Sequence, residues 1–191
     1  MAMNINRSGE VLIVTGAPGV GKTTVAALLA SGNTGPAVHL RGDDFWHCIT
    51  TGLVAPYLPE AHQQNTVVLR VQAAASCEYA RGGYVVVLDG IVGPWFLAPF
   101  TARVAASSVP LSYVVLRPSL ATTVRRARQR VTPDLTDSAP ITSLYEQFDE
   151  RGADLHGHVL DTTDSTPEQT AHQIRALHRC EALRLDPSTA R

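Results

Sequence analysis

The stretch with the most chemical content is GAPGVGKTT, at residues 16–24. Its spacing, in which Gly16 and Gly21 are followed by Lys22 and Thr23, lets backbone N–H groups converge on a phosphate at the start of a helix. The lysine then neutralises the β- and γ-phosphates of a nucleoside triphosphate, and the threonine hydroxyl binds Mg²⁺. A glycine-rich turn with a surface lysine is the simpler alternative, but the stretch directly follows an apolar run and directly precedes a helix-forming one. The predicted nucleotide-binding residues are Gly16, Ala17, Pro18, Gly19, Val20, Gly21, Lys22, Thr23 and Thr24.

Two adjacent acids, Asp43 and Asp44, follow the apolar run at residues 37–40. A carboxylate within hydrogen-bond distance of an alcohol can align it with a γ-phosphate and accept its proton. Asp43 and Asp44 are therefore the candidate contacts for such an acceptor, with a helix cap as the second interpretation of Asp44. In the alternative interpretation both acids only cap a helix that begins at Phe45, or one of them pairs with Arg41.

A third acid, Asp89, ends the apolar run at residues 84–89. An acid at the end of a buried strand beside a phosphate loop is typical of sites that bind Mg²⁺. We predict that Asp89 binds the metal together with Thr23, or that it contacts the substrate. The alternative is an aspartate that only forms a turn.

These side chains need a scaffold that gathers the ends of several strands. Apolar runs predict about five strands, at residues 10–15, 37–40, 84–90, 111–116 and 157–161. Strands that alternate with helices favour a parallel sheet with helices on both faces, and ligands of such sheets lie beyond the carboxyl ends of the strands. We expect one α/β domain over residues 1–191, arranged as a three-layer α/β/α sandwich.

Two of the predicted helices carry specific expectations. The helix at residues 59–81 has an apolar stripe at helical spacing, formed by Val67, Val68, Val71, Ala74, Ala75 and Tyr79. The last helix should begin at Pro167, with Thr166 as its N-cap and Gln169 closing a capping box.

The helix predicted at residues 119–130 carries four arginines. Arg126 and Arg130 are four residues apart and share one face, whereas the other two are expected in solvent. The polar, proline-containing stretch that follows predicts a small mobile lid at about residues 128–141. A fully solvated basic face is the alternative interpretation.

With these motifs in place, the chain resembles the small P-loop kinases of the gluconate kinase, shikimate kinase and chloramphenicol phosphotransferase group. The resemblance extends from VTGAPGVGKTT through RGDDFWH and VVVLDG to LRPSLATTVRRARQR and LDTTDSTPEQT. It implies the P-loop NTPase fold, ATP and Mg²⁺ as cofactors, Asp43 as the base, and Arg126 and Arg130 as catalytic cations over the triphosphate. It also implies that the loop at residues 161–167 holds the adenine edge. Arg41 stands where gluconate kinases have the first Asp of a DGD pattern, which argues against a gluconate-like acceptor.

The composition argues against several classes of partner. The formal net charge of -1 gives no overall attraction to nucleic acid or to anionic membranes. No apolar run approaches the roughly 20 residues of a membrane span. Three widely spaced cysteines fit reduced thiols in a cytoplasmic protein. We expect a small-molecule acceptor, no nucleic-acid or membrane partner, and a monomer or homodimer.

The expected activity is ATP-dependent transfer of a phosphoryl group to a hydroxyl of a small molecule, such as an antibiotic or a sugar acid. Two alternatives stay open. One is a regulatory NTPase switch without a small-molecule acceptor, although the sequence has no N-K-x-D motif for guanine. The other is a toxin-like kinase that acts on nucleotide sugars.

Overall fold

The computed structural model describes residues 9–129, 138–150 and 153–186. Its centre is a five-stranded sheet with the strand order β2-β3-β1-β4-β5. The strands are β1 Glu10–Thr15, β2 Ala37–Arg41, β3 Val85–Asp89, β4 Leu111–Leu116 and β5 Val159–Leu160. Every neighbouring pair of these strands is parallel. Their carboxyl ends therefore lie at one edge of the sheet.

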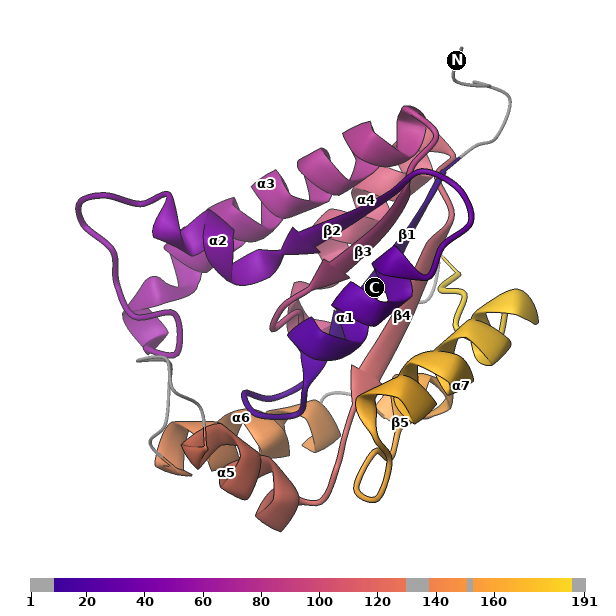
Figure 1. The fold of residues 1–191 in the computed structure, drawn as a ribbon. Helices are drawn as coiled ribbons and strands as arrows, with labels where there is room; N and C mark the ends of the chain where they lie inside the picture. Colours follow the sequence, from indigo (N-terminus) through magenta and orange to yellow (C-terminus); the bar gives the residue numbers. More distant parts are fainter. Residues whose placement is uncertain (1–8, 130–137, 151–152, 187–191) are drawn as a thin grey trace.

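Helices cover both faces of this sheet (Figure 1). α1 and α7 pack together on one face, α3 and α4 pack together on the other, and α5 and α6 lie beyond the carboxyl end of β4. The helices are α1 Lys22–Ser31, α2 Gly42–His47, α3 His62–Arg81, α4 Ala98–Ser107, α5 Leu120–Arg128, α6 Ser138–Glu150 and α7 Pro167–Arg179, with 3₁₀ turns η1 Pro59–Ala61, η2 Pro94–Phe96 and η3 Ala153–His158. The predicted α/β fold with a parallel sheet between helices is confirmed.

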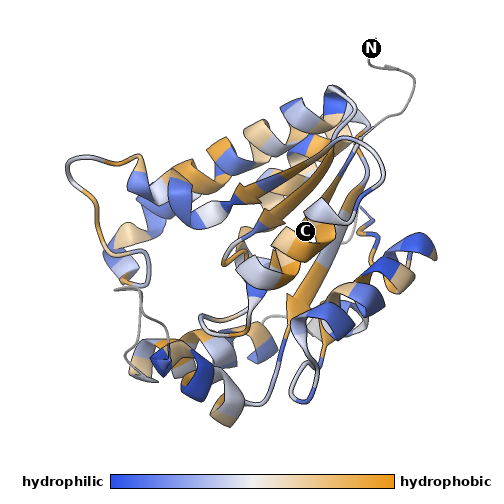
Figure 2. Ribbon diagram, in the orientation of Figure 1, coloured by the Kyte–Doolittle hydropathy of each residue, from blue (hydrophilic) through white to orange (hydrophobic). Residues whose placement is uncertain are grey.

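The central strand β1 is buried on both faces. Alternate residues of a strand point to opposite sides, so Leu12 and Val14 share a core with Ile174 of α7. Ile13 shares the other core with Leu69 of α3. Figure 2 shows mostly hydrophobic strands between helices of mixed hydropathy.

The buried face of α3 coincides only in part with the apolar stripe of its sequence. In this stripe, Val67, Val71 and Tyr79 are exposed, at 54%, 51% and 44%. The residues that face the core are Asn65, Val68, Leu69, Gln72, Ala73, Ser76, Cys77 and Ala80. Gln72 is fully buried, and its Nε2 donates a hydrogen bond to the Gly42 carbonyl at 3.0 Å. Of the stripe, Val68 is buried and Ala74 and Ala75 are partly buried. Apolarity alone therefore does not mark this buried face, which contains a hydrogen-bonded polar side chain.

The predicted capping box of α7 is confirmed. Thr166 Oγ1 accepts from the Gln169 N–H at 3.2 Å, and Gln169 Oε1 accepts from the Thr166 N–H at 2.9 Å. These bonds satisfy two donors that the first turn of a helix leaves unpaired. Among the described helices, none combines the length and apolarity needed to cross a membrane.

Alanine substitutions on the two sides of α3 test which side is buried. Leu69 is 1% exposed, so Leu69→Ala should lower the free energy of unfolding by about 2–5 kcal/mol through lost burial and a residual cavity. Val71→Ala, on the exposed side, should change it by less than about 0.5 kcal/mol. Urea denaturation followed by circular dichroism measures both values, and equal losses would contradict this orientation of α3.

Candidate active site

The motif at residues 16–24 forms the turn between β1 and α1. Gly16 and Gly19 have φ values of 137° and 92°, which side chains rarely adopt. A Cβ added at Gly16 would lie 2.4 Å from the Leu116 carbonyl oxygen, and one at Gly19 would lie 2.6 Å from that of Thr123. Glycine is therefore required at both positions, because the loop packs against the end of β4 and against α5.

The loop ends at a helix N-terminus that carries a buried cation. Gly21 is the N-cap of α1 and supplies no side-chain acceptor, so the first N–H groups of the helix can bind an anion. Lys22 follows, is 6% exposed, and donates from Nζ to the Ala17 carbonyl at 3.0 Å. It is the single lysine among the 16 lysine and arginine residues of the sequence. N–H groups and an ammonium group on one small loop are suited to a triphosphate.

Thr23 and Asp89 meet beside this loop. Thr23 Oγ1 donates to Asp89 Oδ2 at 2.5 Å, and Asp89 is 4% exposed. Burial opposes ionisation of Asp89, but hydrogen bonds from His39 and Thr23, together with the positive charge of Lys22, hold the pKa of its carboxyl below the ordinary value. Mg²⁺ prefers oxygen ligands and is usually bound by one or two protein groups together with phosphates and water. The hydroxyl and the ionised carboxylate fit that ion.

His39 is a member of the site that the sequence did not reveal. Its Nε2 lies 2.8 Å from Asp89 Oδ1, and the two side chains are 19% and 5% exposed. The seven histidines are scattered along the sequence and form no ligand motif. The signal that could have found it is its place in β2, on the strand that ends in the acids.

The acids of the second strand lie in α2, which begins earlier than predicted. Arg41 is the N-cap and α2 starts at Gly42, so Asp43 and Asp44 are in the first turn and neither caps the helix with its side chain. The interpretation of a helix that begins at Phe45 is therefore wrong. Both carboxylates still lie where the helix dipole favours negative charge.

The two acids differ in their contacts. Asp44 Oδ1 lies 3.9 Å from Arg41 Nη1, and both side chains are more than half exposed, so this pair contributes at most about 1 kcal/mol. Asp43 is exposed and, within the described residues, makes no hydrogen bond or ion pair. Its carboxylate is thus available to a ligand.

Contacts from α3 and β3 hold α2 at the carboxyl edge of the sheet. A Cβ added at Gly42 would lie 2.7 Å from the Asp89 carbonyl oxygen, so the start of α2 lies directly against the end of β3. Gln72 of α3 binds the Gly42 carbonyl, and Trp46 Nε1 donates to Asn65 Oδ1 of α3 at 3.0 Å. This packing places Asp43 next to the segment that carries Asp89.

Only part of the predicted lid lies in the described residues. Arg126 of α5 donates to the carbonyls of Thr162 and Thr163 at 3.5 and 3.4 Å. It therefore faces the loop that follows β5, which the resemblance assigns to the adenine edge. Arg130 lies outside the described residues, as does most of the segment 128–141.

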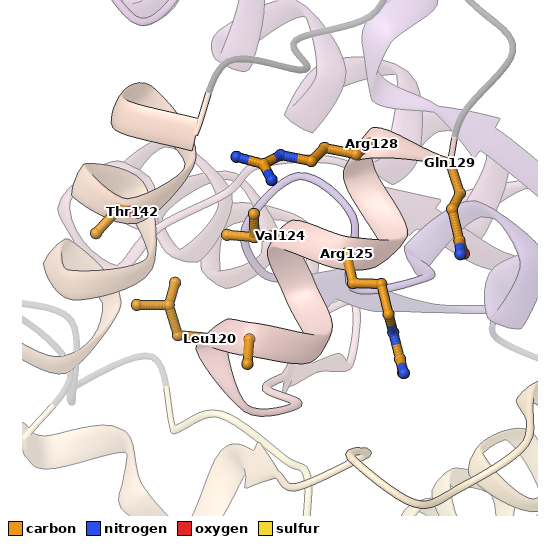
Figure 3. Close-up of a pocket in the computed structure, with 7 residues that line it drawn as sticks. Leu120, Val124, Arg125, Arg128, Gln129 and Thr142 are labelled. Carbon is orange, nitrogen blue, oxygen red and sulfur yellow. The ribbon is translucent and has the colours of Figure 1, made fainter.

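Arginines that were expected in solvent line an open pocket between α5 and α6 (Figure 3). The pocket has a volume of about 600 Å³ and is lined by Leu120, Ala121, Val124, Arg125, Arg128, Gln129 and Thr142. Arg125 and Arg128 are exposed, as predicted. The pocket lining includes neither Thr23 nor Asp89 nor any residue of the phosphate loop, which contacts α5 through Thr123 and Ala127 instead. The pocket is therefore separate from the candidate site.

The chain has the α/β fold of P-loop kinases. A phosphate loop follows the central strand of a parallel sheet, and an acid that ends the adjacent strand binds the loop threonine. Residues 11–151, well over half of the chain, match the family model described as AAA domain, and the chain belongs to this family. A search of curated proteins found no match.

Solved structures with this fold include small kinases. The tunicamycin resistance protein of Deinococcus radiodurans is 17% identical with a TM-score of 0.66, over 89% of this chain and 95% of that one. A gluconokinase from Sinorhizobium meliloti 1021 is 15% identical with a TM-score of 0.61, over 92% and 95%. APS kinase CysC of Mycobacterium tuberculosis, in complex with AMPPNP and APS, is 18% identical with a TM-score of 0.62, over 91% and 99%. The predicted resemblance to small P-loop kinases is confirmed.

Removing the buried cation should weaken nucleotide binding. Lys22→Ala should lower the affinity for ATP by about 10- to 100-fold, since a hydrogen bond to a charged group contributes about 1.5–3 kcal/mol. Isothermal titration calorimetry measures the change. Arg70→Ala, which removes an exposed cation from α3, is the control and should bind as the wild type does.

The single lysine offers an independent test of the same site. An ATP analogue that carries an amine-reactive acyl group should modify Lys22 and no other side chain, and excess ATP should prevent the modification. Peptide mass spectrometry locates the label. Labelling of Lys22 that ATP does not reduce would contradict the assignment.

Proposed function

We propose that this protein is an ATP-dependent phosphotransferase that moves the γ-phosphoryl group to a hydroxyl of a small molecule. The observation that carries the proposal is the pairing of Thr23 with Asp89 beside the phosphate loop, with the exposed carboxylate of Asp43 at the neighbouring strand end. The first two groups suit a magnesium nucleotide. The third is available to an acceptor.

The proposal assigns a role in binding or catalysis to each residue of the candidate site. The backbone N–H groups of the loop at residues 16–21, where Pro18 has none, and the ammonium of Lys22 would bind the phosphates, and Thr23 and Asp89 would hold Mg²⁺. Bound Mg²⁺ neutralises charge on the phosphates. Asp43 aligns the acceptor hydroxyl and takes its proton as the new O–P bond forms and the bond from the γ-phosphorus to the β,γ-bridging oxygen breaks.

The arginines of α5 complete the proposed arrangement. Arg126 faces the loop at residues 161–166, where its guanidinium donates to backbone carbonyls. We assign Arg126 and Arg130 to stabilisation of the charge on the nucleotide during transfer. The lid at about residues 128–141 would exclude water and so limit hydrolysis.

The contacts near Asp43 inform the choice of acceptor. Arg41 is paired with Asp44, so this edge presents one paired acid and one unpaired acid. The related folds belong to proteins named for tunicamycin, gluconate and APS. Tunicamycin and APS are first candidates, and gluconate, which Arg41 argues against, is included for comparison. Aminoglycosides, phenicols, nucleosides and nucleotide sugars extend the panel.

The experiment is Mg·ATP turnover with this panel, in which the mass of each compound is read before and after the reaction. A compound that gains one phosphoryl group with the wild type supports the proposal and identifies the acceptor. ATP hydrolysis that requires a protein partner and modifies no compound would favour a regulatory NTPase.

Asp43→Asn tests the role of the carboxylate. The variant should bind ATP within about twofold of the wild type and lose at least about 100-fold in phosphoryl transfer, since general-base catalysis contributes about 10²–10⁴-fold. Glu168→Gln is the matched control, because Glu168 is also an exposed acid in the first turn of a helix. Full transfer activity in Asp43→Asn would show that Asp43 is neither base nor orienting group.

A further inference from the structure

A histidine on the edge strand binds the buried acid of the site. His39 Nε2 lies 2.8 Å from Asp89 Oδ1, while Thr23 Oγ1 donates to Asp89 Oδ2 at 2.5 Å. The two oxygens of one carboxylate therefore have different partners. An ionised carboxylate can only accept hydrogen bonds, so His39 donates through Nε2–H.

The strand register explains why this contact forms. β2 pairs in parallel with β3, with His39 opposite Val87 and Arg41 opposite Asp89. Residues two apart on a strand share a face, so His39 and Asp89 are diagonal neighbours on one face of the sheet. Val87 belongs to the core that lies under α1, so this is also the face toward which Thr23 projects.

The carboxylate of Asp89 needs a restraint to keep one orientation. Rotation about the last side-chain torsion of an aspartate is broad, with little intrinsic preference. Thr23 alone restrains one oxygen, and in the proposed function this hydroxyl also serves the metal. A second donor on the opposite oxygen fixes the plane of the carboxylate.

We propose that His39 is a positioning residue that holds Asp89 Oδ1, so that Oδ2 stays directed at Thr23 and at the magnesium site. This inference rests on the proposed function, because it assigns His39 to the metal half of the same site. His39 itself binds neither nucleotide nor acceptor. Groups that orient metal-binding side chains commonly change metal affinity or activity by about 10- to 100-fold when they are removed.

The test separates metal binding from nucleotide binding. Calorimetry with the non-hydrolysable analogue AMPPNP is run in EDTA and across a Mg²⁺ titration for the wild type, His39→Leu and His39→Gln. Glutamine can place an N–H donor near the position of Nε2, whereas leucine fills space without a donor. His172→Gln, which changes an exposed histidine of α7, is the control.

Mg²⁺ should increase the affinity for AMPPNP, and we measure the Mg²⁺ concentration that gives half of this increase. In His39→Leu we expect this concentration to rise by about 10-fold or more. The AMPPNP affinity of this variant in EDTA should stay within about twofold of the wild type. His39→Gln should recover most of the Mg²⁺ response, and His172→Gln should match the wild type. Thermal melting confirms that each variant is folded. If the leucine variant does not fold, His39→Ser replaces it in the comparison. The glutamine variant should then keep the Mg²⁺ response, and His39→Ser should lose it.

Three results would overturn the inference. One is a Mg²⁺ response in His39→Leu equal to that of the wild type. Another is an equal loss of AMPPNP affinity in His39→Leu with and without Mg²⁺, which indicates a packing role for His39. The third is a Mg²⁺ response in His39→Gln that is as weak as that of His39→Leu. If the wild type binds no AMPPNP under any condition, the proposed function fails and this inference fails with it.

Discussion

The parallel pairing of β1 with β3 is the constraint on which the candidate site depends. Its register sets Val14 opposite Asp89, so both strands end at the same level of the sheet. The chain that leaves β1 then turns through the phosphate loop into α1, which brings Thr23 to the carboxylate of Asp89. α2 begins against the Asp89 backbone, and the position of Asp43 follows from that contact.

Burial separates the groups of the site by role. Asp89 and Lys22 are buried, and each makes a hydrogen bond. Burial of a charged group without such a partner would destabilise the fold. Interactions with phosphate are strong in such a setting, because little water screens them. Asp43 is exposed, which suits a group that meets an acceptor arriving from solvent.

The sequence predicted the parts of the site that depend on local chemistry. The glycines of the phosphate loop, the apolar strands and the capping box of α7 each follow from spacing within a few residues. The contact of His39 with Asp89 could not be predicted, because it depends on the register between β2 and β3. The buried face of α3 does not follow from its apolar stripe for a similar reason, since Gln72 is stabilised by the carbonyl of Gly42, 30 residues away in the sequence. Arg126 lies on the predicted helix, but its contact depends on where the loop at residues 161–166 folds.

The most direct test of this account is a crystal structure with Mg²⁺ and a non-hydrolysable ATP analogue. We predict β- and γ-phosphates in the loop of residues 16–21, Mg²⁺ at about 2.1 Å from Thr23 Oγ1, and Asp43 on the side of the γ-phosphate that faces solvent. A nucleotide bound elsewhere, or a γ-phosphate directed away from α2, would contradict the account.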